Sequence, residues 1–512
     1  METTIEGRSP VEIIAQLLSA DVDPVQAGVR LQQLANHDGI GGIELFELLA
    51  SAKLGHADPA ILGGLLRLVH VKLLRSDGAI ERLVPATLAA LAERLGDAVP
   101  NRHLLLHLLA KAHTPESLTV LVDSLLRTPP QGWMAAGQVL SPLMQSDDWP
   151  IESVFPRLLD GLSELSLAAP ILDIAAHLVR SGRTAEHVAS DRAEMLEGLL
   201  GEVVGRLGRL EEAPRSFGSD VDTVQTILSE AVALAVSLCD AIGLMGLESA
   251  SGKLRQALEL RHRRVQCEAA GSLARLGIVE GRECLIALAR EPAARLRAIA
   301  YADELGFGDQ IDEELRSDIR TAEAELALWL AQPQNMGVPP SMVEVVDSRR
   351  MLWPSYHDPV DVFLVRFEYD FGDRVYSNVG MTGPGTHVFS ADVADLPVDD
   401  IYAMYAGWHA EHPDIVSLPR EDCNESQLRV FAALADHLER SDYGDVTPER
   451  LCFFLDETAA VFSASHHGVE VLAITDGLET MELATGGRPR PPAPENLFHL
   501  YAGRKMLRTF NS

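Results

Sequence analysis

Apolar residues recur at helical spacing from residue 9 to about residue 332. In one segment, Leu118, Leu121, Val122 and Leu125 fall at i, i+3, i+4 and i+7, which places them on one face of a helix. The alternation that predicts β-strands is nearly absent from this stretch, and short connections separate the apolar segments. The pattern therefore predicts an all-α region.

The starts of several predicted helices share one local signal. Ser9, Pro10 and Glu12 occupy the N-cap, first and third positions before an apolar run, which is the arrangement of a capping box. Asp58, Thr114 and Trp149 likewise precede a proline at the start of an apolar segment. These openings predict helices that begin at Pro10, Pro59, Pro115 and Pro150.

A repeat is clearest near the end of the helical region. The segments CEAAGSLARLG (residues 267–277) and LRAIAYADELG (residues 296–306) align at a spacing of 29 residues. Both carry small residues where helices pack closely, and both end in a glycine that suits the position after a helix. A second apolar segment, RECLIALAREP, lies between them and ends in a proline.

This pattern resembles the HEAT-like repeats, including the shorter form found in phycobilisome lyase subunits. The resemblance is clearest over residues 250–310 and is more degenerate over residues 10–250. It implies an α-solenoid, in which each helix pair contacts its neighbours and the stack presents an extended surface.

The pattern changes at residues 331–344, where Pro333, Gly337, Pro339 and Pro340 interrupt the helical spacing. Strand-like segments follow at residues 361–371, 374–383, 386–393 and 469–476, and helices at about residues 397–411 and 424–440. Residues 447–462 fit a helix starting at Thr447, although a strand over their end stays possible. We therefore expect a multidomain chain: an all-α HEAT-like α-solenoid (residues 1–332), a linker (residues 333–340) and a smaller α+β domain (residues 341–512).

Composition narrows the function classes. A formal net charge of −32 opposes binding to nucleic acid, which needs basic side chains against phosphates. We expect no membrane segment, because no uninterrupted apolar stretch is long enough, and the N-terminus lacks the features of a signal peptide. The five widely spaced cysteines favour a reducing compartment, so we expect a cytoplasmic protein without disulfides.

Residues 405–414 carry the first candidate site. His409 and His412 lie three residues apart and are candidate metal ligands, with Asp414 or a distant histidine completing the set. This spacing differs from the i, i+4 histidines of helical zinc sites. The favoured interpretation is an amphipathic helix whose aromatic stripe, Tyr405 and Trp408, packs against the sheet predicted over residues 361–393.

The remaining candidates are loops and clusters. His466 and His467 are a second pair of candidate metal ligands, and the alternative is a turn in which Gly468 adopts positive φ. The glycines of residues 377–387 favour a hairpin over a phosphate-binding loop, because no helix follows directly. Acidic neighbours should raise the pKa of Cys423, which disfavours a nucleophilic role.

One basic cluster stands out in the acidic chain. Arg261, Arg263 and Arg264 lie together and are candidate partner-binding residues for an acidic peptide; the alternative is a solvated turn between helices.

No catalytic constellation is present in the sequence. The sequence therefore favours a non-enzymatic protein-interaction scaffold without a cofactor, with the acidic α+β domain as cap or second interaction site. Two alternatives remain: a lyase or chaperone-like enzyme related to HEAT-repeat bilin lyases, and an acidic inhibitor of a basic partner.

Overall fold

The computed structural model describes residues 9–19, 24–37, 40–55, 57–332, 334–454, 457–486 and 492–511; the side chains of residues 24, 25 and 411–414 are not included. The chain divides into two compact units, residues 1–285 and 286–512, which are described separately. The division falls inside the helix of residues 279–288, whereas the sequence places the domain boundary at residues 333–340.

The first unit is helical. Its α-helices are α1 (Pro10–Leu17), α2 (Pro24–Ala35), α3 (Gly42–Ser51), α4 (Pro59–Leu74), α5 (Pro85–Leu95), α6 (His103–Lys111), α7 (Pro115–Arg127), α8 (Trp133–Leu140), α9 (Pro142–Gln145), α10 (Leu165–Arg180), α11 (Ala193–Glu212), α12 (Val221–Met245), α13 (Ser251–Leu258) and α14 (Arg263–Arg275), and α15 (Val279–Leu288) spans the division. Short 3₁₀ helices connect them: η1 (Ile80–Arg82), η2 (Ile151–Ser153), η3 (Arg157–Ser163), η4 (Ser190–Arg192), η5 (Pro214–Ser216) and η6 (Glu248–Ala250).

Most of the predicted helix starts are confirmed. Ser9 forms the capping box with Glu12, and the side chains of Asp58 and Thr114 accept backbone hydrogen bonds at the first turns of α4 and α7. The helix predicted from Pro150 is wrong, because this segment forms the 3₁₀ helices η2 and η3. Pro156 lies inside the segment and cannot donate a backbone hydrogen bond to an α-helix there.

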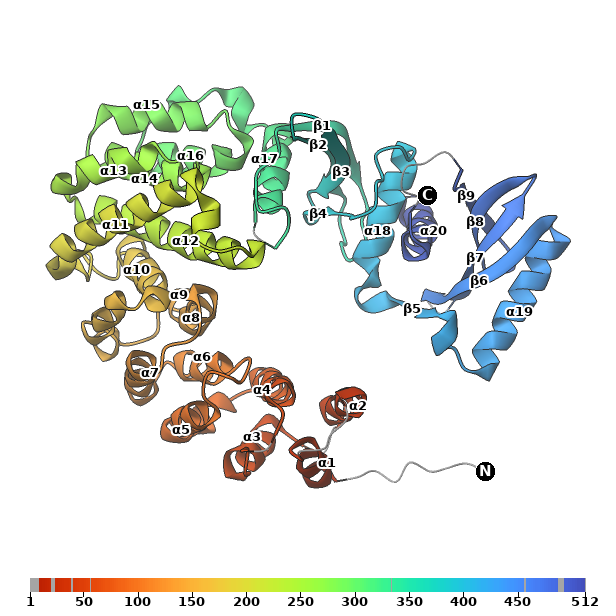
Figure 1. Ribbon diagram of the computed structural model, residues 1–512, viewed down its shortest axis with the longest axis horizontal. Helices are drawn as coiled ribbons and strands as arrows, with labels where there is room; N and C mark the ends of the chain where they lie inside the picture. Colours follow the sequence, from red (N-terminus) through yellow and green to blue (C-terminus); the bar gives the residue numbers. More distant parts are fainter. Residues whose placement is uncertain are drawn as a thin grey trace. The chain divides into compact units, whose positions relative to one another are not determined.

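The helices of the first unit pack in a regular order. The even-numbered helices from α2 to α14 contact one another in succession, while α5 and α7, and likewise α11 and α13, contact each other alongside them. Figure 1 shows this sequence-ordered stacking from red to green. One continuous core of mainly leucine and alanine side chains runs through the unit. The all-α region is therefore an array in which contacts are local in sequence.

Four helices of the helical part of the chain end in the same way. Gly182, Gly246, Gly277 and Gly306 follow α10, α12, α14 and α16 (Pro292–Glu304), with φ between 68° and 77°. After each glycine, the next residue donates its backbone N–H to a carbonyl five positions earlier, as Ile278 does to Leu273 at 2.9 Å and Phe307 to Ala302 at 2.9 Å. This is the Schellman motif, and a left-handed residue is needed there. The glycines predicted at 277 and 306 are confirmed in this role.

The second unit joins helices to two antiparallel sheets. It contains α16, the 3₁₀ helices η7 (Gly308–Gln310) and η8 (Glu313–Arg316), α17 (Asp318–Leu330), the sheet β1 (Met342–Met351), β2 (Val360–Asp370), β3 (Val375–Thr382) and β4 (His387–Val388), α18 (Val398–Asp414), and α19 (Glu425–Arg440). The second sheet is β5 (Ile415–Pro419), β6 (Tyr443–Phe454), β7 (Glu457–His466), β8 (Val469–Thr475) and β9 (Thr480–Ala484), with η9 (Arg420–Asp422) and α20 (Pro494–Asn511) completing the chain. The α+β class predicted for this region is confirmed.

These elements form layers, visible in Figure 1 from α17 to α19. One face of the first sheet packs on α17 through Val365, Phe367 and Tyr369. Its other face, including Val362 and Leu364, packs on α18 and α20. The same two helices cover one face of the second sheet, and α19 covers its other face. Helices and sheets therefore alternate, with the α18–α20 pair between the two sheets.

The α18–α20 pair is held by glycines. A Cβ built at Gly407 would lie 1.9 Å from the backbone oxygen of His499, and one at Gly503 would lie 1.6 Å from that of Ala403. No side chain larger than hydrogen fits at either position, so the two helix backbones are in direct contact. Glycine lowers helix propensity, and close packing is the reason for accepting that cost here.

The helix interpretation of residues 447–462 is wrong. Residues 447–454 and 457–462 belong to strands β6 and β7, which pair antiparallel, and Pro448 lies beside a register shift in the pairing. The side chain of Leu451 packs toward α19, whereas that of its neighbour Cys452 packs toward α18 and α20. Because both faces are covered, the strand lacks polar alternation and its apolar positions also matched helical spacing.

The strand predicted over residues 386–393 is only partly confirmed. Backbone pairing is limited to β4, where His387 and Val388 face β3. Beyond β4, the buried amide of Asn378 substitutes for a strand partner: it donates to the carbonyls of Phe389 and Ala391 at 3.2 and 3.0 Å and accepts from the N–H of Val393 at 3.2 Å. A side chain can thus hold an extended segment without a backbone ladder.

The helix α12 bears on the membrane prediction. Among the residues that the structure describes, it alone is long and apolar enough to cross a membrane, with a mean hydropathy of 1.8 over its most apolar window. However, 72% of that window is buried inside the structure. A core helix passes the same test, so length and composition alone make this weak evidence for a membrane span.

Candidate functional site

The aromatic stripe of α18 packs as expected. The hydroxyl of Tyr405 donates to the carbonyl of Val379 on β3 at 2.7 Å, and Trp408 stacks on His387 of β4 with ring centroids 3.7 Å apart. The prediction that this stripe contacts the sheet of residues 361–393 is confirmed. Burial lowers the pKa of His387 to about 4, so this imidazole is neutral at pH 7 and acts as part of the packing.

His409 lies among aromatic rings. Its ring centroid is 6.5 Å from that of Trp353 and 6.3 Å from that of Tyr356, and burial lowers its pKa. Its Nδ1 atom is buried and has no hydrogen-bond partner among the described residues. The side chain of its proposed co-ligand His412, like that of Asp414, lies outside the described part, so the pair stays a prediction.

His466 and His467 lie in the hairpin between β7 and β8. His467 and Gly468 both have positive φ, 47° and 77°, which fits the tight turn of the alternative interpretation. His466 stacks on Tyr443 with centroids 4.2 Å apart and its Nδ1 lies 2.8 Å from the carboxylate of Glu482. Within the described ranges, no group of three or more His, Cys, Asp and Glu side chains is placed to hold a metal ion.

The basic cluster lies at the start of α14. Arg263 and Arg264 are the first two residues of this helix, where the helix dipole disfavours positive charge. Arg261 and Arg264 are exposed, and neither guanidinium forms a hydrogen bond or ion pair with any described residue. Arg263 donates to the side chain of Gln266 at 2.9 Å. Two exposed guanidinium groups that make no hydrogen bond or ion pair with the described residues can bind carboxylates of a partner.

A network of charges lies beside this cluster. Arg180 of α10 donates to both carboxylate oxygens of Asp240 on α12, and Ser237 donates to Asp173 at 2.7 Å. Burial raises the pKa of Asp173, while Ser237 and the positive charge of Arg264 oppose that rise. The network links consecutive even-numbered helices, so its position indicates a role in fixing their register.

The cysteines carry no reactive site. Cys239, Cys267 and Cys452 are buried, and none of the five cysteines forms a disulfide. Burial raises the pKa of Cys239, and partial burial followed by the charges of Asp422 and Glu421 raises that of Cys423. Thiols with raised pKa values are poor nucleophiles at pH 7.

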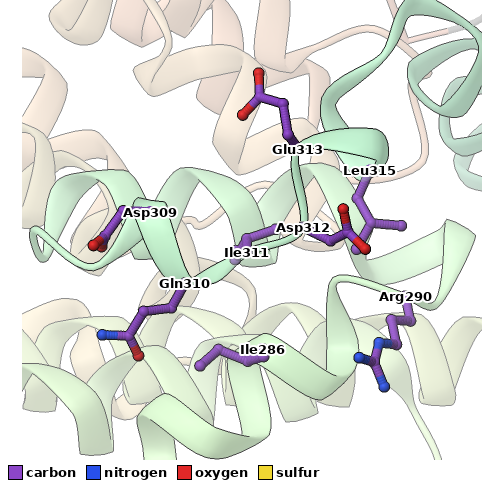
Figure 2. Close-up of a pocket in the computed structure, with 8 residues that line it drawn as sticks. All are labelled: Ile286, Arg290, Asp309, Gln310, Ile311, Asp312, Glu313 and Leu315. Carbon is purple, nitrogen blue, oxygen red and sulfur yellow. The ribbon is translucent and has the colours of Figure 1, made fainter.

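Two hollows lie in the second unit. The first has a volume of about 350 Å³ and lies between α15 and the segment of η7 and η8 (Figure 2); its lining residues are Ile286, Arg290, Asp309, Gln310, Ile311, Asp312, Glu313 and Leu315. Figure 2 shows that the side chains of Arg290 and Glu313 point away from one another. Asp309, Glu313 and Arg290 point in different directions in Figure 2, so these three charged groups do not converge on one point.

The second hollow, the α17 groove, has a volume of about 430 Å³. One wall is α17, and the other is the β1–β2 hairpin with the residues that follow β3. Its lining residues are Asp318, Thr321, Ala322, Glu325, Arg350, Tyr356, Pro359, Val360, Asp361, Phe363, Gly383 and Pro384. It combines carboxylates with two aromatic rings. The sequence gives no signal for it, because its two walls come from segments far apart in the chain.

Comparison with protein-family models finds no match, and neither the curated proteins nor the solved structures compared with this chain match it. The geometry of the chain itself is therefore the basis for any functional assignment.

Proposed function

We propose that this chain is a non-enzymatic protein-interaction scaffold whose helical array is a HEAT-like α-solenoid. The α+β unit adds a second interaction site. The observation that carries this proposal is the local packing order of the array, in which the even-numbered helices contact one another in succession. A stack with contacts between neighbours only leaves long helix faces free for a partner.

The glycine-terminated helices support the repeat assignment. The same Schellman ending at Gly182, Gly246, Gly277 and Gly306 gives α10, α12, α14 and α16 a common exit geometry. A common exit turns the chain in the same direction after each helix, as repeated units require.

The start of α14 is the proposed contact point on the array. The guanidinium groups of Arg261 and Arg264 are exposed and make no ion pair with the described residues, whereas Arg255 nearby pairs with Glu280 at 2.6 Å. An exposed guanidinium without an ion-pair partner next to a helix N-terminus favours an acidic segment of a protein partner.

The experiment is affinity capture from an extract of the native host with the full chain. The wild type is compared with the double variant Arg261→Ala, Arg264→Ala and with a matched control, Arg67→Ala, Arg82→Ala, which removes the same charge from exposed array positions. We expect one protein that rebinds the purified wild type at a fixed stoichiometry. We expect the double variant to bind it about tenfold more weakly, because two exposed charge pairs contribute up to about 1 kcal/mol each.

The control should bind the partner as the wild type does. An extract that yields no stoichiometric protein partner contradicts the scaffold proposal. Equal binding by all three chains contradicts the assignment of the contact to the start of α14.

A further inference from the structure

We propose that the α17 groove binds an arginine side chain from a basic segment of a protein partner. The inference rests on the proposed function, because it names the chemistry of the second interaction site. It assigns a role to a place that no sequence motif marks.

The groove has the form of a side-chain site. Asp318, Thr321, Ala322 and Glu325 lie at i, i+3, i+4 and i+7 of α17 and form one wall. The opposite wall holds the ring of Tyr356, whose hydroxyl donates to the carbonyl of Pro384 at 2.8 Å. That hydrogen bond joins the segment after β1 to the segment after β3, so it fixes the shape of this wall. Its volume of about 430 Å³ lies in the roughly 300–1,000 Å³ range of ligand sites.

The charges of the groove are not balanced within it. Arg350 is neutralised by Asp361, with 2.9 Å between Nη1 and Oδ2. The carboxylates of Asp318 and Glu325 have no hydrogen-bond or ion-pair partner in the described part of the chain. Asp318 is the first residue of α17, where the helix dipole stabilises a negative charge. Glu325 has no such compensation.

Glu325 is the residue that points to a cation. It is half-buried in the middle of α17, and burial raises the pKa of its carboxyl. A charge without a partner in such a place costs stability. A cation bound in the groove would remove that cost. We therefore take the unpaired, half-buried carboxylate of Glu325 as a sign that it binds a cation.

The aromatic rings favour arginine over other cations. Phe363 and Tyr356 line the same groove as the carboxylates. A guanidinium can stack on an aromatic face while its N–H groups pair with a carboxylate, and it is more weakly hydrated than an ammonium. The net charge of −32 also raises the encounter rate with basic segments.

The test measures binding of a fluorescent nine-residue peptide with arginine at every third position, in parallel with the same peptide carrying citrulline. Citrulline keeps the shape and removes the charge. Fluorescence anisotropy is read at about 150 mM salt, where screening limits non-specific attraction to the acidic chain. We expect the wild type to bind the arginine peptide at least tenfold more tightly than the citrulline peptide.

Three variants of the full chain locate the site. Glu325→Gln should weaken binding of the arginine peptide about tenfold, as the loss of a charged hydrogen bond does. Tyr356→Ala should weaken it about threefold through the loss of a ring contact. Glu313→Gln, which removes an exposed carboxylate outside the groove, should change binding less than twofold. Thermal unfolding separates the binding role from a structural one, because Glu325→Gln should not lower the melting temperature.

Equal weakening by Glu325→Gln and Glu313→Gln overturns the inference, because long-range charge alone would then explain binding. Equal affinity of the wild type for the two peptides also overturns it. A host protein captured through the array that binds the Glu325→Gln chain unchanged overturns the groove assignment and leaves the proposed function standing. If the arginine peptide binds in the groove but no host partner is captured, the groove assignment is supported and the scaffold proposal is contradicted.

Discussion

Replacing Gly503 by alanine tests the packing of the second unit most severely. The added methyl would lie 1.6 Å from the backbone oxygen of Ala403, less than half of the 3.4 Å at which ordinary contact begins. The obstacle is a backbone atom, so no rotamer change can relieve the clash. The helices α18 and α20 must move apart, and the sheets on either side of the pair oppose that movement.

The magnitude follows from this geometry. Overpacking a well-packed core costs typically 1–3 kcal/mol, and a backbone obstacle places Gly503→Ala at about 3 kcal/mol or more. Against a typical free energy of unfolding of about 5–15 kcal/mol, this loss is large enough to populate the open form of the helix pair. Gly407→Ala should behave alike, because its methyl would meet the backbone oxygen of His499 at 1.9 Å.

The assay is hydrogen exchange of the full chain, read by mass spectrometry in peptides from α18 and α20. Local readout is needed because a chain of two units need not unfold in one step. The control is Gly198→Ala in α11, where no atom outside its own helix lies within 4 Å of the added methyl. That change should stabilise α11 by about 0.5–1 kcal/mol through helix propensity. Unchanged protection of α18 and α20 in Gly503→Ala would refute the direct backbone contact.

Three further changes test other parts of the structure. Glu323→Gln should lower the free energy of opening of α16 and α17 by about 3 kcal/mol, read by hydrogen exchange, because Glu323 is the buried partner of both Arg295 and Arg320 and is 3% exposed. Gly277→Ala should cost about 1–2 kcal/mol, since φ is 76° there, whereas Gly205→Ala at an open helical position should not destabilise the chain. The folded-state pKa of Glu325 lies above its ordinary value of 4.5, so the stability that its protonated form confers is lost as pH rises through the raised pKa. Glu325→Gln should therefore reduce the loss of stability between pH 4 and pH 7, measured by denaturation at both values, and an unchanged loss would contradict the burial of this carboxyl.

The helical array was predictable because its signals are local. The capping box of Ser9 and Glu12 and the glycine ends at Gly277 and Gly306 depend on residues within one turn, and all of them are confirmed. The HEAT-like assignment itself stays a proposal, because packing order is compatible with it but does not identify a family.

The second unit was harder to predict because its elements are covered on both sides. Strands β6 and β7 lie between α19 and the α18–α20 pair, so their apolar positions do not alternate with polar ones. The helix α20 was not predicted, nor were strands β1, β5 and β9. An element that is covered on both faces carries apolar residues on both faces, so it lacks the amphipathic pattern on which helix and strand predictions depend.

The candidate sites also differ in how far the sequence could predict them. The stripe of Tyr405 and Trp408 was assigned to the correct sheet, because a helix face and an adjacent apolar sheet are both visible in sequence. The α17 groove was missed because Glu325 and Tyr356 are brought together only by the packing of α17 on the first sheet. A contact between distant segments leaves no spacing that a single sequence can reveal.

The central claim is that the array binds a protein partner, and a hydrogen-exchange footprint of the full chain with and without the captured partner tests it most directly. We predict slower exchange on binding in peptides from the start of α14 and from its neighbours α10 and α12. Protection confined to residues outside the helical array would contradict the claim.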